Sequence, residues 1–260
     1  KTYKHKALYN IPEFFAVCRK NFRYALTTFV FYAIIGTRNF CGTPHLYLVG
    51  GTLTMKIMRS QYLNQLIKKM HNGRVKIITG IRRCGKSYLL FELFGKYLRE
   101  NGVQDDQIVE LALDEIQNFQ YRNPFELDAY IRRQITDKTK QYYVMIDEIQ
   151  FVSEVPNPYV NDDSAKIGFS DVLLGLMKIK NADIYVTGSN SKMLSSDVLT
   201  QFRDRGDEIR VYPLSYAEFC SAYSGKPQNP WREYYTYGGM PLVLSFDTHE
   251  EKSKYLKDLF

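Results

Sequence analysis

Residues 80–87 read Gly-Ile-Arg-Arg-Cys-Gly-Lys-Ser, which has the spacing G-x-x-x-x-G-K-S. This spacing is typical of a phosphate-binding P-loop, because its two glycines let the backbone bend and approach an anion closely. Lys86 is placed to reach the β- and γ-phosphates of a nucleoside triphosphate, and the Ser87 hydroxyl to bind Mg²⁺. The residues expected to contact the nucleotide are Gly80, Ile81, Arg82, Arg83, Cys84, Gly85, Lys86, Ser87 and Tyr88.

The sequence on both sides of this loop fits a strand–loop–helix unit. Val75–Thr79 is short and rich in β-branched residues, as a buried parallel strand is. After the loop, leucines and aromatic residues recur at helical spacing as far as a stop at Asn101-Gly102. The helix would direct its partial positive charge at the phosphates. A glycine turn without a ligand is the alternative, and these flanks disfavour it.

A second motif ends the apolar run Tyr142–Ile146, which is followed by Asp147 and Glu148. A strand that ends in two acids is typical of the Walker B motif. We expect Asp147 to hold Mg²⁺ and Glu148 to orient and polarise the attacking water. The alternative is an ordinary strand end with two solvated acids, which the upstream P-loop disfavours.

Polar and basic residues after the next apolar strand, Ile184–Thr187, are further candidates. Ser189 or Asn190 is expected to sense the γ-phosphate, although both residue types also favour turns and helix caps. Arg203 and Arg205 are candidates to offset charge on the transferred phosphoryl group, within one chain or from a neighbouring subunit. Surface salt bridges are the alternative for these arginines.

The rest of the chain predicts alternating helices and strands. Strands are expected at Gln107–Leu113 and Glu208–Tyr212. Helices are expected at Arg59–His71, Asn123–Thr136, Ser170–Met177 and Trp231–Tyr237, and after capping boxes that begin at Ser215 and Thr248. The polar stretch Val152–Gly168 is expected to be a loop, either a partner contact or an inert hairpin.

Charge is distributed unevenly along the 260 residues, which carry a net charge of +7. Residues 1–54 hold seven Lys/Arg and one acid, whereas the remaining residues hold 28 Lys/Arg and 27 Asp/Glu. Residues 55–260 are therefore nearly neutral, which does not favour strong binding to a nucleic-acid backbone.

Residues 1–54 lack the periodicity of the rest, and the first Met is Met55. Three interpretations are open: upstream sequence translated before a start at Met55, which we favour, the remnant of a preceding domain, or a membrane-proximal anchor. The most apolar run, Tyr24–Gly36, is shorter than the ~20 residues needed to span a bilayer, so no membrane span is expected. We expect this segment to be poorly ordered and to lack catalytic residues.

The predicted organisation is an N-terminal extension (1–54), an ATPase core (55–224) and a helical segment that begins a truncated C-terminal region (225–260). Four cysteines occur, none of them in a C-x-x-C pair, and the four histidines complete no zinc pattern. This usage is typical of a reducing compartment and predicts a cytoplasmic protein without disulfides.

Five motifs in sequence order resemble a prokaryotic family of AAA-type P-loop ATPases. They are the P-loop (80–87), Ile-Asp-Glu-Ile-Gln (146–150), Tyr-Val-Thr-Gly-Ser-Asn-Ser (185–191), Val-Tyr-Pro-Leu-Ser (211–215) and Tyr-Gly-Gly-Met-Pro (237–241). The resemblance implies an α/β fold of the additional-strand, catalytic-glutamate type, with the P-loop strand central in a five-stranded parallel sheet flanked by helices. It assigns the motif roles to Lys86, Ser87, Asp147, Glu148 and the pair Ser189/Asn190.

This chain departs from the family pattern in two respects. Family members tend to have glycine where Asp204 stands between the two arginines, and this acid puts the arginine role in doubt. The nuclease-like C-terminal domain of unknown function that such proteins usually carry is also missing from residues 1–260.

The favoured function is Mg²⁺-dependent ATP hydrolysis coupled to a conformational change, with ATP and Mg²⁺ as cofactors. Glu148 favours water as the nucleophile. An ATP-gated switch with negligible turnover is the second hypothesis, and a DNA-handling motor or loader is the third. Each of these three functions is compatible with self-association or with an unidentified protein partner.

Overall fold

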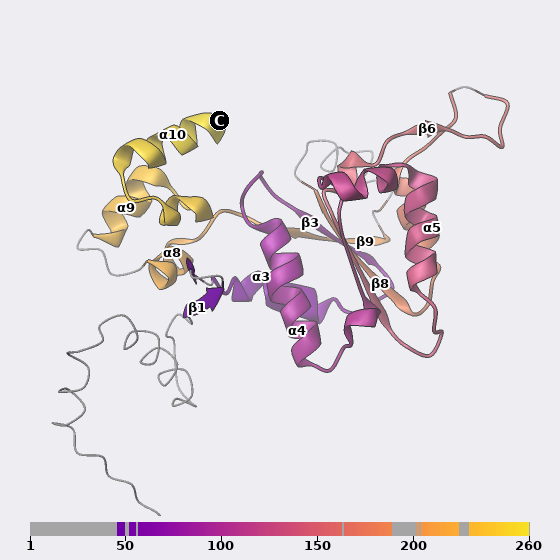
Figure 1. Ribbon diagram of the computed structural model, residues 1–260, viewed down its shortest axis with the longest axis horizontal. Helices are drawn as coiled ribbons and strands as arrows, with labels where there is room; N and C mark the ends of the chain where they lie inside the picture. Colours follow the sequence, from indigo (N-terminus) through magenta and orange to yellow (C-terminus); the bar gives the residue numbers. More distant parts are fainter. Residues whose placement is uncertain are drawn as a thin grey trace, which may run out of the picture. The chain divides into compact units, whose positions relative to one another are not determined.

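The computed structural model describes residues 46–49, 52–55, 57–162, 164–188, 202, 204–223 and 229–259. The chain divides into Lys1–Thr43 and Pro44–Phe260, and every described residue belongs to the second unit. That unit has an α/β fold built on a five-stranded sheet (Figure 1). In the described part of the chain, no helix combines the length and the apolar character that crossing a membrane requires.

The sheet is parallel throughout, and its strand order is β4-β5-β8-β3-β9. Its strands are β3 (Val75–Thr79), β4 (Ile108–Ala112), β5 (Tyr142–Asp147), β8 (Ala182–Gly188) and β9 (Gly206–Arg210). A five-stranded parallel sheet is what the sequence predicts, but the expected central position of the P-loop strand is wrong. Strand β3 lies one strand from the edge, because only β9 lies beyond it, and β8 is the middle strand.

Helices lie on both faces of this sheet, whereas η5 and α10 pack in a separate cluster. The helices of the described residues are α3 (Ser60–Lys68), η1 (Tyr88–Phe94), α4 (Gly95–Glu100), η2 (Asp105–Gln107), η3 (Ile116–Arg122), α5 (Pro124–Gln134), η4 (Ile149–Phe151), α6 (Phe169–Leu176), α8 (Tyr216–Ala222), α9 (Pro230–Tyr237), η5 (Pro241–Ser245) and α10 (His249–Leu259). Figure 1 shows α3 and α4 on one side of the sheet and α5 on the other.

Alternate residues of β3 face two separate cores. Ile77 packs in a core that includes Leu127 of α5 and Val172 of α6, whereas Ile78 packs with Leu66 of α3 and Leu90 of η1. Side chains on the two faces of a strand point in opposite directions, so a strand covered on both faces reads as a continuous apolar run. This explains why β5 is buried at every position.

Most elements lie where the sequence predicts them, with two informative differences. The helix after the P-loop begins as the π-helix η1 before it continues as α4. Strand β9 begins two residues earlier than expected, at Gly206, which pairs with Val75. A Cβ at Gly206 would lie 2.9 Å from Cδ1 of Ile77 and 3.1 Å from Cβ of Phe202, so a larger residue there would displace these side chains.

The predicted helix caps are present at two positions. At the start of α8, Oγ of Ser215 accepts a hydrogen bond from the N–H of Glu218, and the Glu218 carboxylate accepts one from the N–H of Ser215. Thr248 and Glu251 make the same reciprocal pair before α10. At the start of α5, Asn123 instead caps the N–H of Phe125.

Two short hairpins complete the described structure. Strands β1 (Leu46–Val49) and β2 (Thr52–Met55) pair antiparallel, within the stretch that the sequence separates from the ATPase core. Strands β6 (Val155–Pro156) and β7 (Lys166–Ile167) form a hairpin in the expected polar loop. Poor order is expected for residues 1–54, and of these, residues 1–45, 50 and 51 lie outside the described residues, so the expectation stays a prediction.

Candidate nucleotide-binding site

The P-loop follows β3 at the carboxyl end of the parallel sheet, where ligands of open α/β sheets bind. Gly80 has φ +146°, and a Cβ there would lie 2.2 Å from the carbonyl oxygen of Val211. Gly85 has φ +94°, in the region that L side chains rarely adopt. Both glycines of the motif are therefore required by the backbone path itself.

The residues between these glycines differ in exposure. Ile81, Arg82 and Arg83 are exposed, whereas Cys84 is fully buried with its Sγ 3.5 Å from the carbonyl oxygen of Val211. Burial raises the pKa of the Cys84 thiol above its ordinary value. The P-loop cysteine is therefore a packed neutral thiol rather than a nucleophile.

Lys86 lies against the loop rather than in solvent. Only 4% of it is exposed, and its Nζ donates hydrogen bonds to the carbonyl oxygens of Gly80 and Ile81, each at 3.2 Å. A phosphate oxygen carries more negative charge than a peptide carbonyl and would be a stronger acceptor for this ammonium. The side chain is thus placed to bind a phosphate by exchanging partners.

A chain of hydrogen bonds joins the P-loop to the acidic end of β5. Ser87 Oγ donates to Asp147 Oδ2 at 2.7 Å, and Thr187 Oγ1 of β8 donates to the other oxygen, Oδ1. The Thr187 hydroxyl also accepts the backbone N–H of Glu148 at 3.0 Å. One hydroxyl therefore contacts the carboxylate of Asp147 and the backbone of Glu148.

The surroundings of Asp147 fit a hard cation. Burial raises the pKa of Asp147, and the hydrogen bonds from Thr187 and Ser87 only partly offset this effect. An adjacent cation would favour the ionised carboxylate, and the hydroxyl and carboxylate oxygens are the ligand type that Mg²⁺ prefers. Ser87 and Asp147 could thus hold Mg²⁺ together with water and phosphate oxygens.

Glu148 turns the chain sharply at the end of β5. Its backbone is left-handed, with φ 55° and ψ 49°, and it caps the 3₁₀ turn η4. Its carboxylate accepts a hydrogen bond from Nε2 of Gln150, two residues later. The carboxylate of the predicted water-orienting residue is therefore held by a neighbouring amide.

The structure does not bring all predicted residues together. Ser189, Asn190 and Arg203 lie outside the described residues. Arg205 is exposed, and its carbonyl accepts the N–H of Val75, the first residue of β3. About 13 Å of strand, four residues at ~3.3 Å each, separate that position from the P-loop end. A role for Arg205 within its own chain does not fit, and a role in a neighbouring subunit stays a prediction.

Three residues at this site escape the motif analysis: Thr187, Gln150 and Arg59. Thr187 belongs to the motif 185–191 but carries no expected role, and the signal that could have identified it is a buried hydroxyl near the end of β8. Gln150 belongs to the motif Ile-Asp-Glu-Ile-Gln but carries no expected role. Arg59 donates to the carbonyl of Cys84 from 25 residues away, a contact that no local pattern predicts.

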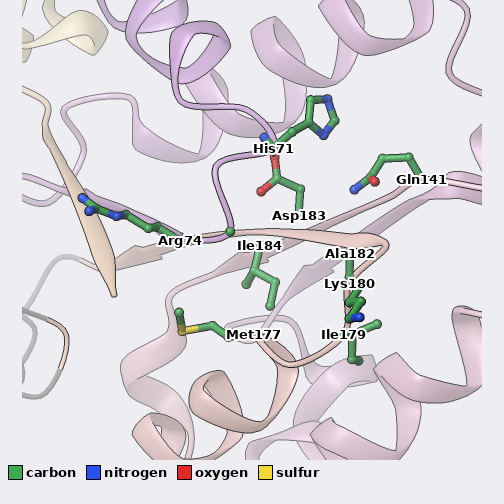
Figure 2. Close-up of a pocket in the computed structure, with 10 residues that line it drawn as sticks. His71, Arg74, Gln141, Met177, Ile179, Lys180, Ala182, Asp183 and Ile184 are labelled. Carbon is green, nitrogen blue, oxygen red and sulfur yellow. Dashed lines mark hydrogen bonds between the residues drawn. The ribbon is translucent and has the colours of Figure 1, made fainter. Parts of the chain in front are cut away.

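A separate cavity of about 300 Å³ lies at the amino ends of the strands, away from the P-loop. Figure 2 shows its side chains spread along the strand ends, with Arg74 and Gln141 at opposite sides of the view. Asp183 in its wall accepts hydrogen bonds from Nζ of Lys76 and from Tyr185. Among the described residues, no group of three His, Cys, Asp or Glu is placed to hold a metal ion.

Comparison with known families agrees with this geometry. The sequence profile of a family described as "AAA domain" matches residues 72–220, more than half of the chain, from before the P-loop to helix α8. This chain belongs to the AAA domain family.

Two curated relatives of this AAA domain protein are uncharacterized proteins. One, from Haemophilus influenzae, is 32% identical over 196 residues, which cover 74% of this chain and 45% of that protein. The other, from Methanocaldococcus jannaschii, is 24% identical over 218 residues, which cover 77% of this chain and 43% of that protein. The chain thus spans less than half the length of either relative.

Solved structures similar to this AAA domain include a Walker-type ATPase of Pyrococcus abyssi, with a TM-score of 0.47 at 16% identity. That match covers 78% of this chain and 68% of the other. A DNA polymerase III gamma subunit-related protein of Thermotoga maritima matches with a TM-score of 0.45 at 13% identity, over 76% of this chain and 58% of that one.

Proposed function

We propose that this AAA domain binds ATP with Mg²⁺ and hydrolyses it, and that the hydrolysis is coupled to a conformational change. The observation that carries the proposal is the hydrogen-bond chain from Ser87 through Asp147 and Thr187 to Glu148. It joins a P-loop to two acids at the carboxyl end of a parallel sheet, which is the arrangement that P-loop NTPases use for phosphoryl transfer.

Each residue has a distinct role in this proposal. Lys86 binds the β- and γ-phosphates, and Ser87 and Asp147 hold the metal ion, which neutralises charge that develops on the phosphate oxygens when it is bound. Glu148 accepts a hydrogen bond from water and orients it for in-line attack. Catalysis then rests on positioning and on charge stabilisation rather than on a covalent intermediate.

The test is Mg²⁺-dependent ATP hydrolysis by the 260-residue chain, with ATP binding measured in parallel. The Glu148→Gln variant is expected to bind ATP but to lose turnover by at least a hundredfold, and Lys86→Ala to lose binding. If the folded wild-type chain does not bind ATP, the proposal is wrong. If Glu148→Gln hydrolyses ATP as fast as wild type, Glu148 is not the water-orienting residue.

An ATP-gated switch with negligible turnover is a second candidate, and the contact between Gln150 and Glu148 favours it. The amide of Gln150 occupies a carboxylate oxygen that catalysis would use for water. If this contact suppresses turnover, Gln150→Ala hydrolyses ATP faster than wild type at equal ATP affinity. If wild type hydrolyses ATP slowly and Gln150→Ala hydrolyses it at the same rate, the contact does not restrain Glu148.

A further inference from the structure

Arg59, at the amino end of α3, has an unusual environment for an arginine. Only 3% of the residue is exposed, and its backbone is left-handed, with φ 41° and ψ 37°. Such a backbone is unfavourable for residues other than glycine and asparagine, and it persists where surrounding contacts determine it. The contacts of the side chain show which interactions do so here.

The Arg59 guanidinium joins three segments that are far apart in the sequence. One terminal nitrogen donates to the carbonyl oxygen of Cys84 at 3.0 Å, and the other donates to the carbonyl oxygen of Tyr212 at 2.6 Å. Nε lies 3.1 Å from Oε1 of Glu218, as an ion pair rather than an aligned hydrogen bond. The ring of Tyr62 lies under the guanidinium carbon, 4.6 Å away. The group is thus held on all sides.

The contact with Cys84 bears on phosphate binding through peptide geometry. The peptide between Cys84 and Gly85 is planar and trans, so its C=O and N–H point in opposite directions. Because Arg59 holds the carbonyl of Cys84, the N–H of Gly85 points away from Arg59. In a P-loop such N–H groups are the phosphate ligands.

We propose that Arg59 is a positioning residue for phosphate binding, which orients the Cys84–Gly85 peptide and links it to helix α8. The inference rests on the proposed ATP-binding function and adds a residue that lies outside the P-loop motif. The guanidinium also places a positive charge behind this peptide, which strengthens its N–H as a donor to an anion.

The link to α8 runs through both oxygens of one carboxylate. Oε2 of Glu218 accepts the N–H of Ser215 as the helix cap, and Oε1 pairs with Arg59. The preceding segment is also tied to α9, because Tyr234 donates to the carbonyl oxygen of Leu214 at 3.0 Å. A displacement of α8 would therefore move Glu218 and, through Arg59, the P-loop peptide.

The experiment measures binding of ATP and of tripolyphosphate by calorimetry, with Mg²⁺, in the 260-residue chain. Tripolyphosphate has neither base nor sugar, so it reports on the P-loop alone. Arg59→Gln is expected to lower the affinity for both ligands at least tenfold, which is about 1.4 kcal/mol of binding free energy. Arg59→Lys keeps the charge but cannot direct two donors at the Cys84 and Tyr212 carbonyls at once, so its affinity for both ligands is expected to fall several-fold. It also serves as the test if Arg59→Gln does not fold.

Arg122→Gln is the matched control for a merely structural effect. Nε of Arg122 donates to the carbonyl oxygen of Leu113 at 2.8 Å, so this variant also removes an arginine from a backbone carbonyl, at a half-buried position outside the P-loop. It is expected to retain tripolyphosphate affinity within twofold, with urea unfolding used to compare the stabilities. Glu218→Gln should lower the tripolyphosphate affinity by about two- to fivefold, because it removes the ion pair with Arg59 but keeps the contact between Arg59 and Cys84.

The outcomes separate this inference from the proposed function. If wild type binds neither ligand, the proposed function is wrong and the inference with it. If wild type binds both and the Arg59 variants bind equally well, Arg59 does not position the loop. An equal loss in Arg122→Gln would mean a general effect on stability, and an unchanged Glu218→Gln would overturn the link to α8.

Discussion

Replacing Thr187 with Val tests whether the two acids depend on one buried hydroxyl. The substitution keeps the branched shape of the side chain and removes its oxygen. Two hydrogen bonds disappear: the one donated to Asp147 and the one accepted from the N–H of Glu148. Thr187 itself is fully buried, so water cannot replace its hydroxyl without a rearrangement of β8.

The size of the effect follows from these two bonds. A neutral hydrogen bond contributes about 1 kcal/mol net, and one to a charged group contributes about 1.5–3 kcal/mol. If ~2–3 kcal/mol of this is lost from the transition state, kcat falls roughly 30- to 150-fold, at about 1.4 kcal/mol per factor of ten. The affinity for ATP should change far less, because the phosphates are bound mainly by the P-loop.

The assay is steady-state ATP hydrolysis together with ATP binding, in Thr187→Val and in Thr187→Ser. The Ser variant keeps the hydroxyl and loses one methyl group. Its kcat should therefore stay within about threefold of wild type, while its free energy of unfolding falls by about 1 kcal/mol. A Val variant that is folded and turns over like wild type would refute the reasoning. If only the affinity for ATP falls, Thr187 contributes to ATP binding and does not position the two acids.

Lys76→Met should lower the free energy of unfolding by about 3–5 kcal/mol, because it leaves the buried Asp183 carboxylate without its cation. The double variant Lys76→Met/Asp183→Asn should recover most of that loss. If urea unfolding shows that the losses of the two single variants add up in the double variant, the prediction is contradicted. Burial lowers the pKa of Lys76 in the folded protein below its ordinary value of 10.5, so the unfolded chain binds this proton more tightly. The free energy of unfolding should therefore rise with pH between the folded-state pKa and the unfolded-state pKa. That rise should be absent from the double variant. Gly239→Ala should cost about 1–3 kcal/mol, since its Cβ would lie 2.1 Å from the carbonyl oxygen of Leu214. Gly168→Ala, where the nearest atom would be 3.5 Å away, is the control in thermal unfolding.

Local patterns predict the elements of this fold better than their arrangement. Strand β3 has the bounds that its β-branched run predicts, and the caps at Ser215 and Thr248 form as their spacing indicates. The position of β3 in the sheet depends instead on which strands pair with it, which its own sequence does not encode. The start of β9 depends likewise on its pairing with β3, in which Gly206 lies opposite Val75.

The same distinction holds at the site. Ser87 and Asp147 carry recognisable motifs, and parallel strands bring their carboxyl ends to one edge, so their contact follows from the topology. Arg59 carries no motif, because its role depends on partners 25 and 153 residues away. Glu148 could be identified as an acid at a strand end, but its partner Gln150 becomes visible only when the chain has turned through a left-handed residue.

The two ends of the sheet show why buried charge alone does not identify a site. At the amino end, Asp183 accepts from Lys76, from Tyr185 and from the N–H of His71, so its strong donors are provided by the protein. At the carboxyl end, the partners of Lys86 among the described residues are peptide carbonyls, which a phosphate would outcompete. The first arrangement stabilises one state of the fold, whereas the second would gain free energy if an anion bound. This difference in partners, rather than the degree of burial, supports the proposal that the ligand binds at the P-loop edge.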